Sequence, residues 1–257
     1  KKHLFKSIKL FTKGKLNLPN DSSAGDIYYK DRKIEISIKH VDGARLINAK
    51  IPKFHKGIPL EYDLTVKALN EDSLVIVTPY ADDKKAFYYN QKINNLSATG
   101  TVKFGDEVYE FKDTQGVLDW GRGVWTRDNT WYWSSMSTLA KDGTPIGFNL
   151  GYGFGDTSAA SENMVFYKGK SYKLNDVDFG IPADSFTKEW HFTSKDKAID
   201  MKFTPLYDNF NYINLLVLKQ DSHQVFGVFN GTIRVSKDLV VPIKDAFGFA
   251  EKVRNVW

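Results

Sequence analysis

The segment LDWGRGVW brings together an acid, a guanidinium and an indole, as Asp119, Arg122 and Trp125. An acid beside an Arg can be tuned as a proton donor or can help to hold an anion, and a Trp can stack on the guanidinium. The same spacing recurs at the end of the sequence in Glu251, Arg254 and Trp257. Because a duplicated set is more simply structural, we interpret each as an acid-Arg lock over a Trp. Asp119 is kept as the first candidate for a catalytic acid, with Arg122 and Trp125 as candidate ligand contacts.

Tryptophan is concentrated around and after this motif. In TWYWSS, the alternation of a strand places Trp131 and Trp133 on one face and Tyr132 on the other. Such a pair suits the wall of an apolar cavity, although ordinary core packing explains it equally well. Trp120 has Lys252 opposite it in the second motif, so it occurs once. We expect Trp120, Trp131 and Trp133 to contact a ligand.

The run GFNLGYGFGD has glycine at alternate positions, as Gly151, Gly153 and Gly155. This is not the phosphate-binding fingerprint, because the spacing is GxGxG and no βαβ unit surrounds it. On a strand, these glycines would clear one face for a ligand or another backbone, with Tyr152 and Phe154 on the other face. The polar residues around this bare face are candidates for contacting a ligand or for holding turns: Asn149, Asp156, Glu162 and Asn163.

The five histidines form no metal-binding or catalytic pattern. They show no HxH or HExxH spacing, so we predict no metal site, and we expect no cofactor. There is also no GxSxG elbow and no Ser-His-Asp pattern. His191 follows Trp190 on a predicted strand and could be an acid-base partner, although such a histidine is more often structural. Glu162 and Asp156 are further alternatives to Asp119 as the acid.

Composition limits the class of protein and its partners. Aromatic residues make up 14% of the chain, with 18 Phe and 13 Tyr beside many Val, Ile and Thr, which favours strands. The formal charge of +5 comes from scattered residues, so we expect no nucleic-acid partner. No segment has the roughly 20 consecutive apolar residues of a membrane span. The absence of Cys fits a reducing compartment, and we expect a cytoplasmic protein. Composition does not predict the oligomeric state.

Short alternating runs between turn residues predict a mainly β chain. Within residues 33–41, Ile34, Ile36 and Ile38 alternate with polar residues, which is the period of a half-buried strand. Similar runs predict strands along most of the chain, among them residues 73–78, 86–92, 147–152 and 213–218. Short helical turns are expected only near residues 158–162 and 245–253.

An internal repeat organises these strands. Residues 100–125 align with residues 231–257, with one inserted residue. The alignment pairs Gly100 with Gly231, Asp113 with Asp245, Gly116 with Gly248, Asp119 with Glu251 and Trp125 with Trp257. A period of about half the chain predicts a tandem duplication of small antiparallel β-barrels or sandwiches. We expect one barrel in residues 1–115 and the other in residues 116–257.

The segments GVLDWGRGVW, WYW, NLGYGFGD, SENMVFYKGKSYKL, QVFGVFNGT and GFAEKVRNVW carry a family resemblance. They resemble a bacterial family catalogued as domain of unknown function 2804, over most of residues 87–257. More remotely, the chain is similar to the superfamily of carotenoid 1,2-hydratases and AttH-like proteins. The family resemblance implies no activity, whereas the remote one implies two lipocalin-like β-barrels with an apolar ligand cavity.

These observations leave three functional hypotheses. The first is a lipocalin-like protein that binds a hydrophobic small molecule, a lipid or an isoprenoid, in a pocket lined by Trp120, Trp131, Trp133 and Tyr152. The second is a hydratase or cyclase that protonates a polyene with a carboxylic acid in a dry cavity. The third is a carbohydrate or surface-interaction module, which would need exposed tryptophans.

Overall fold

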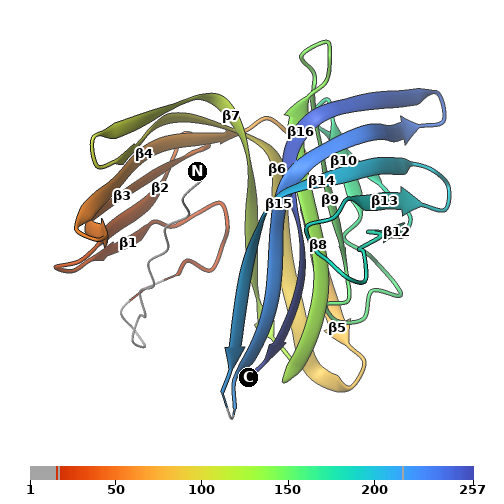
Figure 1. The fold of residues 1–257 in the computed structure, drawn as a ribbon, viewed down its shortest axis with the longest axis horizontal. Coiled ribbons are helices and arrows are strands. Elements are labelled where there is room, and N and C mark those ends of the chain that lie inside the picture. Colours follow the sequence, from red (N-terminus) through yellow and green to blue (C-terminus); the bar gives the residue numbers. More distant parts are fainter. Residues whose placement is uncertain (1–15, 17, 216) are drawn as a thin grey trace. The chain divides into compact units, whose positions relative to one another are not determined.

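The computed structural model of this chain describes residue 16, residues 18–215 and residues 217–257. Within these residues the chain is all β and contains no helix, so the prediction of a mainly β protein is confirmed. The strands form two antiparallel sheets (Figure 1). These two sheets do not by themselves establish the predicted tandem pair of barrels.

The first sheet has seven strands in the order β1-β2-β3-β4-β6-β5, and β7 pairs with β6. Its strands are β1 (Ile27–Lys30), β2 (Glu35–Val41), β3 (Ala44–His55), β4 (Ile58–Ala68), β5 (Leu74–Tyr80), β6 (Asp83–Phe104) and β7 (Glu107–Val124). Alternation of the kind seen in the sequence is clearest in β5. There Leu74, Ile76, Thr78 and Tyr80 are buried, while the residues between them are exposed.

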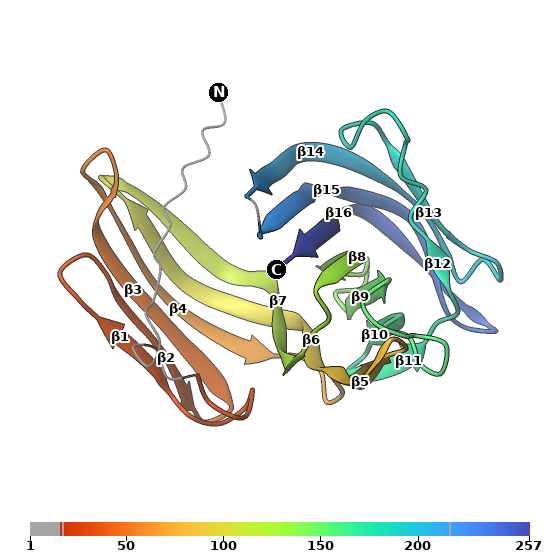
Figure 2. The ribbon, with the colours of Figure 1, turned by 90° about the horizontal axis from the view of Figure 1, so that it is seen from below.

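The second sheet has nine strands in the order β11-β10-β9-β8-β16-β15-β14-β13-β12 and curves into a half-barrel (Figure 2). Its strands are β8 (Asp128–Leu139), β9 (Pro145–Tyr152), β10 (Met164–Tyr167), β11 (Lys170–Lys173), β12 (Val177–Asp178), β13 (Trp190–Ser194), β14 (Ile199–Asn214), β15 (Lys219–Ser236) and β16 (Leu239–Val256). Strand β16 lies between β8 and β15, so the end of the chain is at the centre of this sheet.

The chain divides into two compact units, each built from two segments. One unit contains the described residues of Lys1–Ala68 together with Leu96–Gly116, and the other contains Leu69–Asn95 together with Val117–Trp257. Strands β6 and β7 therefore each contribute residues to both units. The predicted boundary between residues 115 and 116 stays a prediction. All the residues of the site described below belong to the second unit.

The half-barrel holds an aromatic core. Phe203 and Phe229 lie 4.5 Å apart, Phe148 lies 5.2 Å from Phe229, and Trp190 lies 5.6 Å from Phe203, measured between ring centroids. All of these side chains are fully buried. Burial of each contributes on the order of 1.5–3 kcal/mol, so this core stabilises the second unit.

A buried polar residue attaches β6 to the half-barrel. The side chain of Asn94, which is fully buried, donates hydrogen bonds to the Ser135 hydroxyl and to the Phe148 carbonyl, both at 2.8 Å. The backbone N–H of the next residue, Asn95, donates a further hydrogen bond to the Ser137 hydroxyl, at 2.9 Å. These bonds fix the face of β6 that carries the site against β8 and β9.

Two local predictions are wrong. Residues 245–253, expected to form helical turns, lie within β16, and residues 158–162 are not helical either. Pairing with β15 on one side and β8 on the other outweighs the helix-forming Ala, Glu and Lys of this segment. Of the strand expected over residues 213–218, Ile213 and Asn214 form the end of β14, and residue 216 lies outside the described residues. Leu215, Val217 and Leu218 are exposed and are not in a strand, and the Leu215 N–H donates to the Leu218 carbonyl at 2.8 Å.

Candidate functional site

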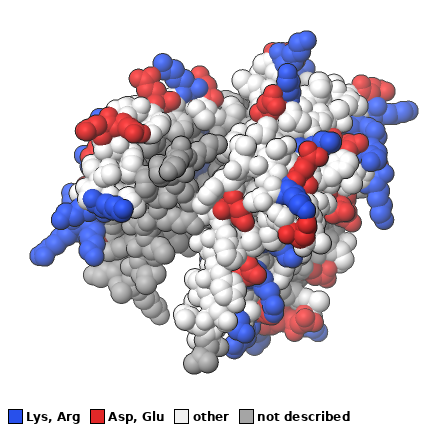
Figure 3. Space-filling model, viewed as in Figure 1, with Lys and Arg blue, Asp and Glu red and all other residues white. Residues whose placement is uncertain are grey.

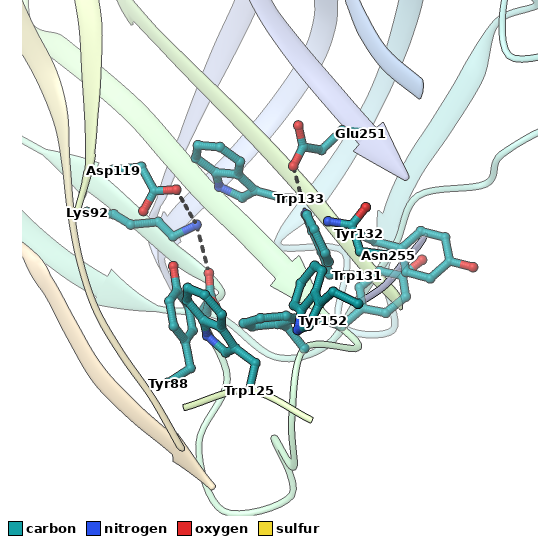
Figure 4. A pocket seen from close by; sticks show the side chains of 13 residues that line it. Tyr88, Lys92, Asp119, Trp125, Trp131, Tyr132, Trp133, Tyr152, Glu251 and Asn255 are labelled. Atoms are coloured by element: carbon teal, nitrogen blue, oxygen red, sulfur yellow. Dashed lines mark hydrogen bonds and ion pairs between the residues drawn. The ribbon is translucent and has the colours of Figure 1, made fainter. Parts of the chain in front are cut away.

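A cavity of about 390 Å³ opens in the second unit between strands of the two sheets (Figure 4). This volume lies within the range of small-molecule sites. Strands β6 and β7 supply one wall, and β8, β9 and β16 supply the other, together with the segment after β9. The lining residues are Tyr88, Lys92, Asp119, Trp125, Trp131, Tyr132, Trp133, Tyr152, Phe154, Glu162, Glu251, Asn255 and Trp257.

Aromatic rings from distant parts of the chain meet around Phe154. Its ring centroid lies 4.8 Å from that of Tyr88, 5.2 Å from Trp131 and 6.3 Å from Trp125. Trp125 in turn lies 6.0 Å from Trp257, edge to face. Trp125 and Trp257 are each 41% exposed, so they form the part of the lining that solvent reaches.

A buried lysine also lines the cavity. The Lys92 side chain is 4% exposed, and its Nζ is 3.2 Å from Glu162 Oε2 and 3.8 Å from Asp119 Oδ2. The same Nζ is 3.7 Å from the centroid of the Trp133 ring, a cation-π contact. An ammonium group can be buried here because two carboxylates and an aromatic face replace its water.

Hydrogen bonds hold the two carboxylates that flank Lys92. The Asn90 side chain donates to Asp119 Oδ1 at 2.7 Å. Asn149, fully buried, accepts from the Trp133 indole at 2.7 Å and donates to the Glu162 backbone carbonyl at 2.9 Å. Asn149 therefore acts from behind the wall of the cavity and positions Trp133 and Glu162.

The glycines of GFNLGYGFGD are required for different structural reasons. A Cβ on Gly151 would lie 3.1 Å from Glu162 Oε2, so this glycine gives space to a carboxylate. Gly153 and Gly155 lie beyond the end of β9 with φ of 90° and 76°, and a Cβ on either would be within 3 Å of a backbone carbonyl, of Thr130 and Pro79 respectively. The expected strand with one bare face ends at Tyr152, and close approach by other backbone explains the last two glycines.

Glu251 is as deeply buried as Glu162 and more deeply buried than Asp119. Its Oε1 accepts from the Trp131 indole at 2.8 Å and its Oε2 accepts from the Gln224 amide at 3.0 Å. Burial raises the pKa of Glu251 above the usual value, and these hydrogen bonds and the charge of Lys92 oppose the rise only in part. A carboxyl group in this position can retain its proton and donate it inside an apolar cavity.

The Tyr88 phenol, on β6, also has a raised pKa. Burial raises the pKa of Tyr88 well above its ordinary value, and the nearby carboxyl groups Asp119 and Glu162 add to the rise. The Tyr88 hydroxyl is hydrogen-bonded to the Asn90 side chain. Tyr88 therefore contributes an aromatic edge and a neutral hydroxyl to the cavity.

The structure brings many of the predicted site residues to one place. Asp119, Glu162, Trp125, Trp131, Trp133 and Tyr152 line the cavity. Asn149 stands directly behind it, and Asn163 accepts a hydrogen bond from the Gly151 N–H at 2.9 Å, which holds the end of β9.

Other predicted residues lie outside the lining. Trp120 packs its ring edge to face on Tyr89, and Arg122 is likewise not a lining residue. The Asp156 carboxylate accepts from the Ser158 N–H at 3.0 Å and holds a turn. His191 is 58% exposed on β13 and pairs with Asp200 at 2.9 Å.

The acid-Arg pairing expected in the second motif is wrong. Arg254 donates to both carboxylate oxygens of Asp128, at 3.1 and 2.7 Å, while Glu251 receives its hydrogen bonds from Trp131 and Gln224. Residues three apart on a strand point to opposite faces, which separates the Glu251 and Arg254 side chains.

Sequence reasoning missed Lys92, Tyr88, Phe154 and Glu251 as members of the site. A signal for Lys92 was present, because Asn90, Lys92 and Asn94 alternate on one face of a strand where apolar residues are usual. For Glu251 the signal was its alignment with Asp119, which we interpreted only as structural. The two aligned acids line the same cavity.

The surface charge in Figure 3 is mixed, and the described residues contain no cluster suited to a metal ion. On the face seen in Figure 3, Lys and Arg side chains are interspersed with Asp and Glu. In the part of the chain that the structure describes, no group of three or more His, Asp or Glu side chains could hold a metal ion. Nor do the described residues include a helix with the length and apolar character needed to span a membrane.

The fold and the site together define an all-β protein with a half-barrel sheet and an aromatic cavity that contains a buried lysine and carboxyl groups. The chain belongs to the family described as domain of unknown function (DUF2804), whose family model matches residues 2–257. No curated protein and no solved structure matched the chain.

Proposed function

We propose that this protein binds a hydrophobic small molecule, a lipid or an isoprenoid, in the aromatic cavity of the second unit. The observation that carries the proposal is the convergence of rings on one cavity of about 390 Å³, from β6, β8, β9, the segments after β7 and β9, and Trp257 after β16. Aromatic side chains supply much of the contact energy of apolar ligands, and the exposed edges of Trp125 and Trp257 give the ligand a way in. We place this activity in the cytoplasm, on the cysteine-free composition.

Titration with an apolar fluorophore tests this proposal. The tryptophans at the cavity are internal donors, so a bound polyene fatty acid such as parinaric acid should quench their emission in a saturable way. Phe154→Ala should weaken binding because it removes the ring at the centre of the cluster. Phe210→Ala, which removes an exposed ring on β14 outside the lining, is the matched control. The absence of a saturable response from every apolar probe would refute the proposal.

A second candidate function is acid catalysis on a polyene, as in a hydratase or cyclase. The observation that favours it is Glu251, whose raised pKa lets it carry a proton into the cavity, with aromatic faces nearby to stabilise a cation. In this proposal Glu251 replaces Asp119 as the first candidate acid, because Asp119 is committed to Lys92 and Asn90. Loss of turnover in Glu251→Gln with ligand binding retained would support it, and turnover by that variant would refute it.

A carbohydrate or surface-interaction module is a weaker alternative. It needs tryptophan faces open to solvent, whereas Trp131 and Trp133 are half-buried and commit their indole N–H groups to Glu251 and Asn149. Quenching of tryptophan emission by acrylamide measures their accessibility and separates this alternative from the first two.

We further propose that the β6–β7 and β15–β16 hairpins descend from one duplicated lipocalin-like unit. The aligned glycines support this, since Gly100 and Gly231 have φ of 133° and 148°. A Cβ at either position would lie 2.0 or 2.3 Å from a carbonyl oxygen of the neighbouring strand, of Asp63 or Asp200. The aligned aspartates Asp113 and Asp245 also have positive φ, of 51° and 49°. Shared backbone irregularities of this kind are expected when two hairpins have a common origin.

A further inference from the structure

The ionisable groups of the cavity are unevenly balanced. Its lining contains the carboxyl groups of Asp119, Glu162 and Glu251 but only one ammonium group, that of Lys92. Lys92 is already flanked by Glu162 and Asp119, at 3.2 and 3.8 Å. One positive charge against two or three carboxylates leaves a net charge of about −1 with Glu251 protonated and about −2 with it ionised. A low-dielectric cavity with this charge attracts a cation.

Among the described residues, cations lie over only two rings of the lining, Lys92 over Trp133 and Lys252 over Tyr132. Lys92 lies over the ring of Trp133, on the wall formed by β8. The rings of Tyr88, Trp125 and Trp131 gather instead around Phe154, and the Trp257 ring packs on Trp125. Several electron-rich ring faces directed at one space are the arrangement that recognises quaternary and alkylated ammonium groups.

Two polar groups connect this aromatic cluster with the acidic side of the cavity. Trp131 donates its indole N–H to Glu251 at 2.8 Å, which fixes the ring and raises its electron density towards a cation. Asn255 also lines the cavity, and its buried amide oxygen has no hydrogen-bond partner among the described residues. A carbonyl oxygen directs its negative end towards a positive ligand or a donor.

We infer that the ligand of this cavity is an amphipathic organic cation, whose alkylated ammonium group lies among Trp131, Trp125 and Phe154 with Glu251 as its counter-charge. This inference rests on the proposed binding function and adds the charge of the ligand to it. The apolar remainder of the ligand then occupies the space beside Tyr88 and Trp257. A neutral lipid of the same shape would leave the excess carboxylate charge uncompensated.

A pair of shape-matched probes tests the charge directly. Phenyltrimethylammonium and tert-butylbenzene differ in one atom, nitrogen or carbon, and can be titrated at pH 8 against tryptophan emission. The inference predicts that the unaltered protein binds the cation about tenfold or more tightly than the neutral probe. This comparison requires no variant to fold.

Charge-removing variants then locate the preference. Glu251→Gln should reduce the affinity for phenyltrimethylammonium about tenfold and change that for tert-butylbenzene less than twofold. Glu189→Gln, an exposed carboxylate paired with Lys202 on the same unit, is the matched control and should change neither affinity. Near-UV circular dichroism establishes that each variant is folded, and Trp131→Phe supplies a second variant that removes the donor to Glu251.

The outcomes separate the two levels of the proposal. Equal affinity for the two probes, or a preference for tert-butylbenzene, overturns the inference about charge while the binding function stands. A cation preference that survives in both Glu251→Gln and Trp131→Phe also overturns it. If parinaric acid and both probes all fail to bind, the proposed function itself is refuted.

Discussion

The buried Lys92 offers the sharpest test of how the cavity is built. Lys92→Met keeps a side chain of similar length but removes the ammonium group. At an effective dielectric constant of about 20, the attraction across 3.2 Å to Glu162 is worth about 5 kcal/mol and that across 3.8 Å to Asp119 about 4 kcal/mol. The cost of removing water from these groups offsets most of this sum. Truncating one partner of a buried pair nevertheless costs about 3–5 kcal/mol, because the other charge stays buried.

Urea unfolding followed by tryptophan emission and far-UV circular dichroism measures this loss. We expect Lys92→Met to lose about 3–5 kcal/mol of unfolding free energy, and the double variant with Glu162→Gln to recover more than half of it. Lys202→Met, which breaks the exposed pair with Glu189 at 3.2 Å, should change stability little because solvent screens that pair. A loss below about 1 kcal/mol for Lys92→Met, or no recovery in the double variant, would refute this account of the buried pair.

Three further results are expected. Because burial raises the pKa of Glu251, with Lys92 and Asp119 as the charges facing it, the folded state binds the Glu251 proton more tightly than the unfolded state does. The stability that this proton contributes is therefore lost as pH rises from about 4.5 through the raised pKa. Urea midpoints at pH 4.5 and pH 8 should show Glu251→Gln becoming more stable relative to the unaltered protein at the higher pH. Gly100→Ala and Gly231→Ala should each lose about 1–3 kcal/mol in urea, and Gly116→Ala, where a Cβ meets Leu96 at an ordinary 3.7 Å, should lose clearly less; a similar small loss at all three would argue against shared strain in the two hairpins. His191→Asn should leave the affinity for parinaric acid unchanged in the same emission titration, since His191 lies on the exposed face of β13, and a large loss would place a second binding region there.

Alternation of apolar and polar residues predicted the strands well where one face of the strand is buried and the other is exposed to solvent. The alternation in β5 has direct counterparts in the burial of its side chains, because strand geometry fixes which neighbours share a face. It failed at residues 245–253, where helix-forming residues are held in β16 by partners on both sides. It succeeded only in part for the strand expected over residues 213–218: Ile213 and Asn214 belong to β14, but the exposed Leu215, Val217 and Leu218 do not, because apolar residues do not by themselves indicate burial.

Only part of the candidate site was predicted, because local patterns locate a region of the chain but not the contacts between distant residues. Concentration of tryptophan and glycine between residues 116 and 156 pointed to the right region, and Trp131, Trp133, Asp119 and Glu162 do line one cavity. The motif alone could not show which acid is paired. More than forty residues separate Glu162 from Asp119 along the chain, and Lys92 reaches both from β6.

The sequence by itself predicted that the chain is mainly β, that two of its segments share a spaced pattern of Gly, Asp and Trp, and that aromatic residues gather in one region. Only the tertiary structure decided which of these rings face a common space, and that Lys92 and Glu251 belong with them. The physical reason is that strand alternation and turn preferences act between near neighbours, whereas a cavity and the charges within it arise from pairing between strands far apart in the chain.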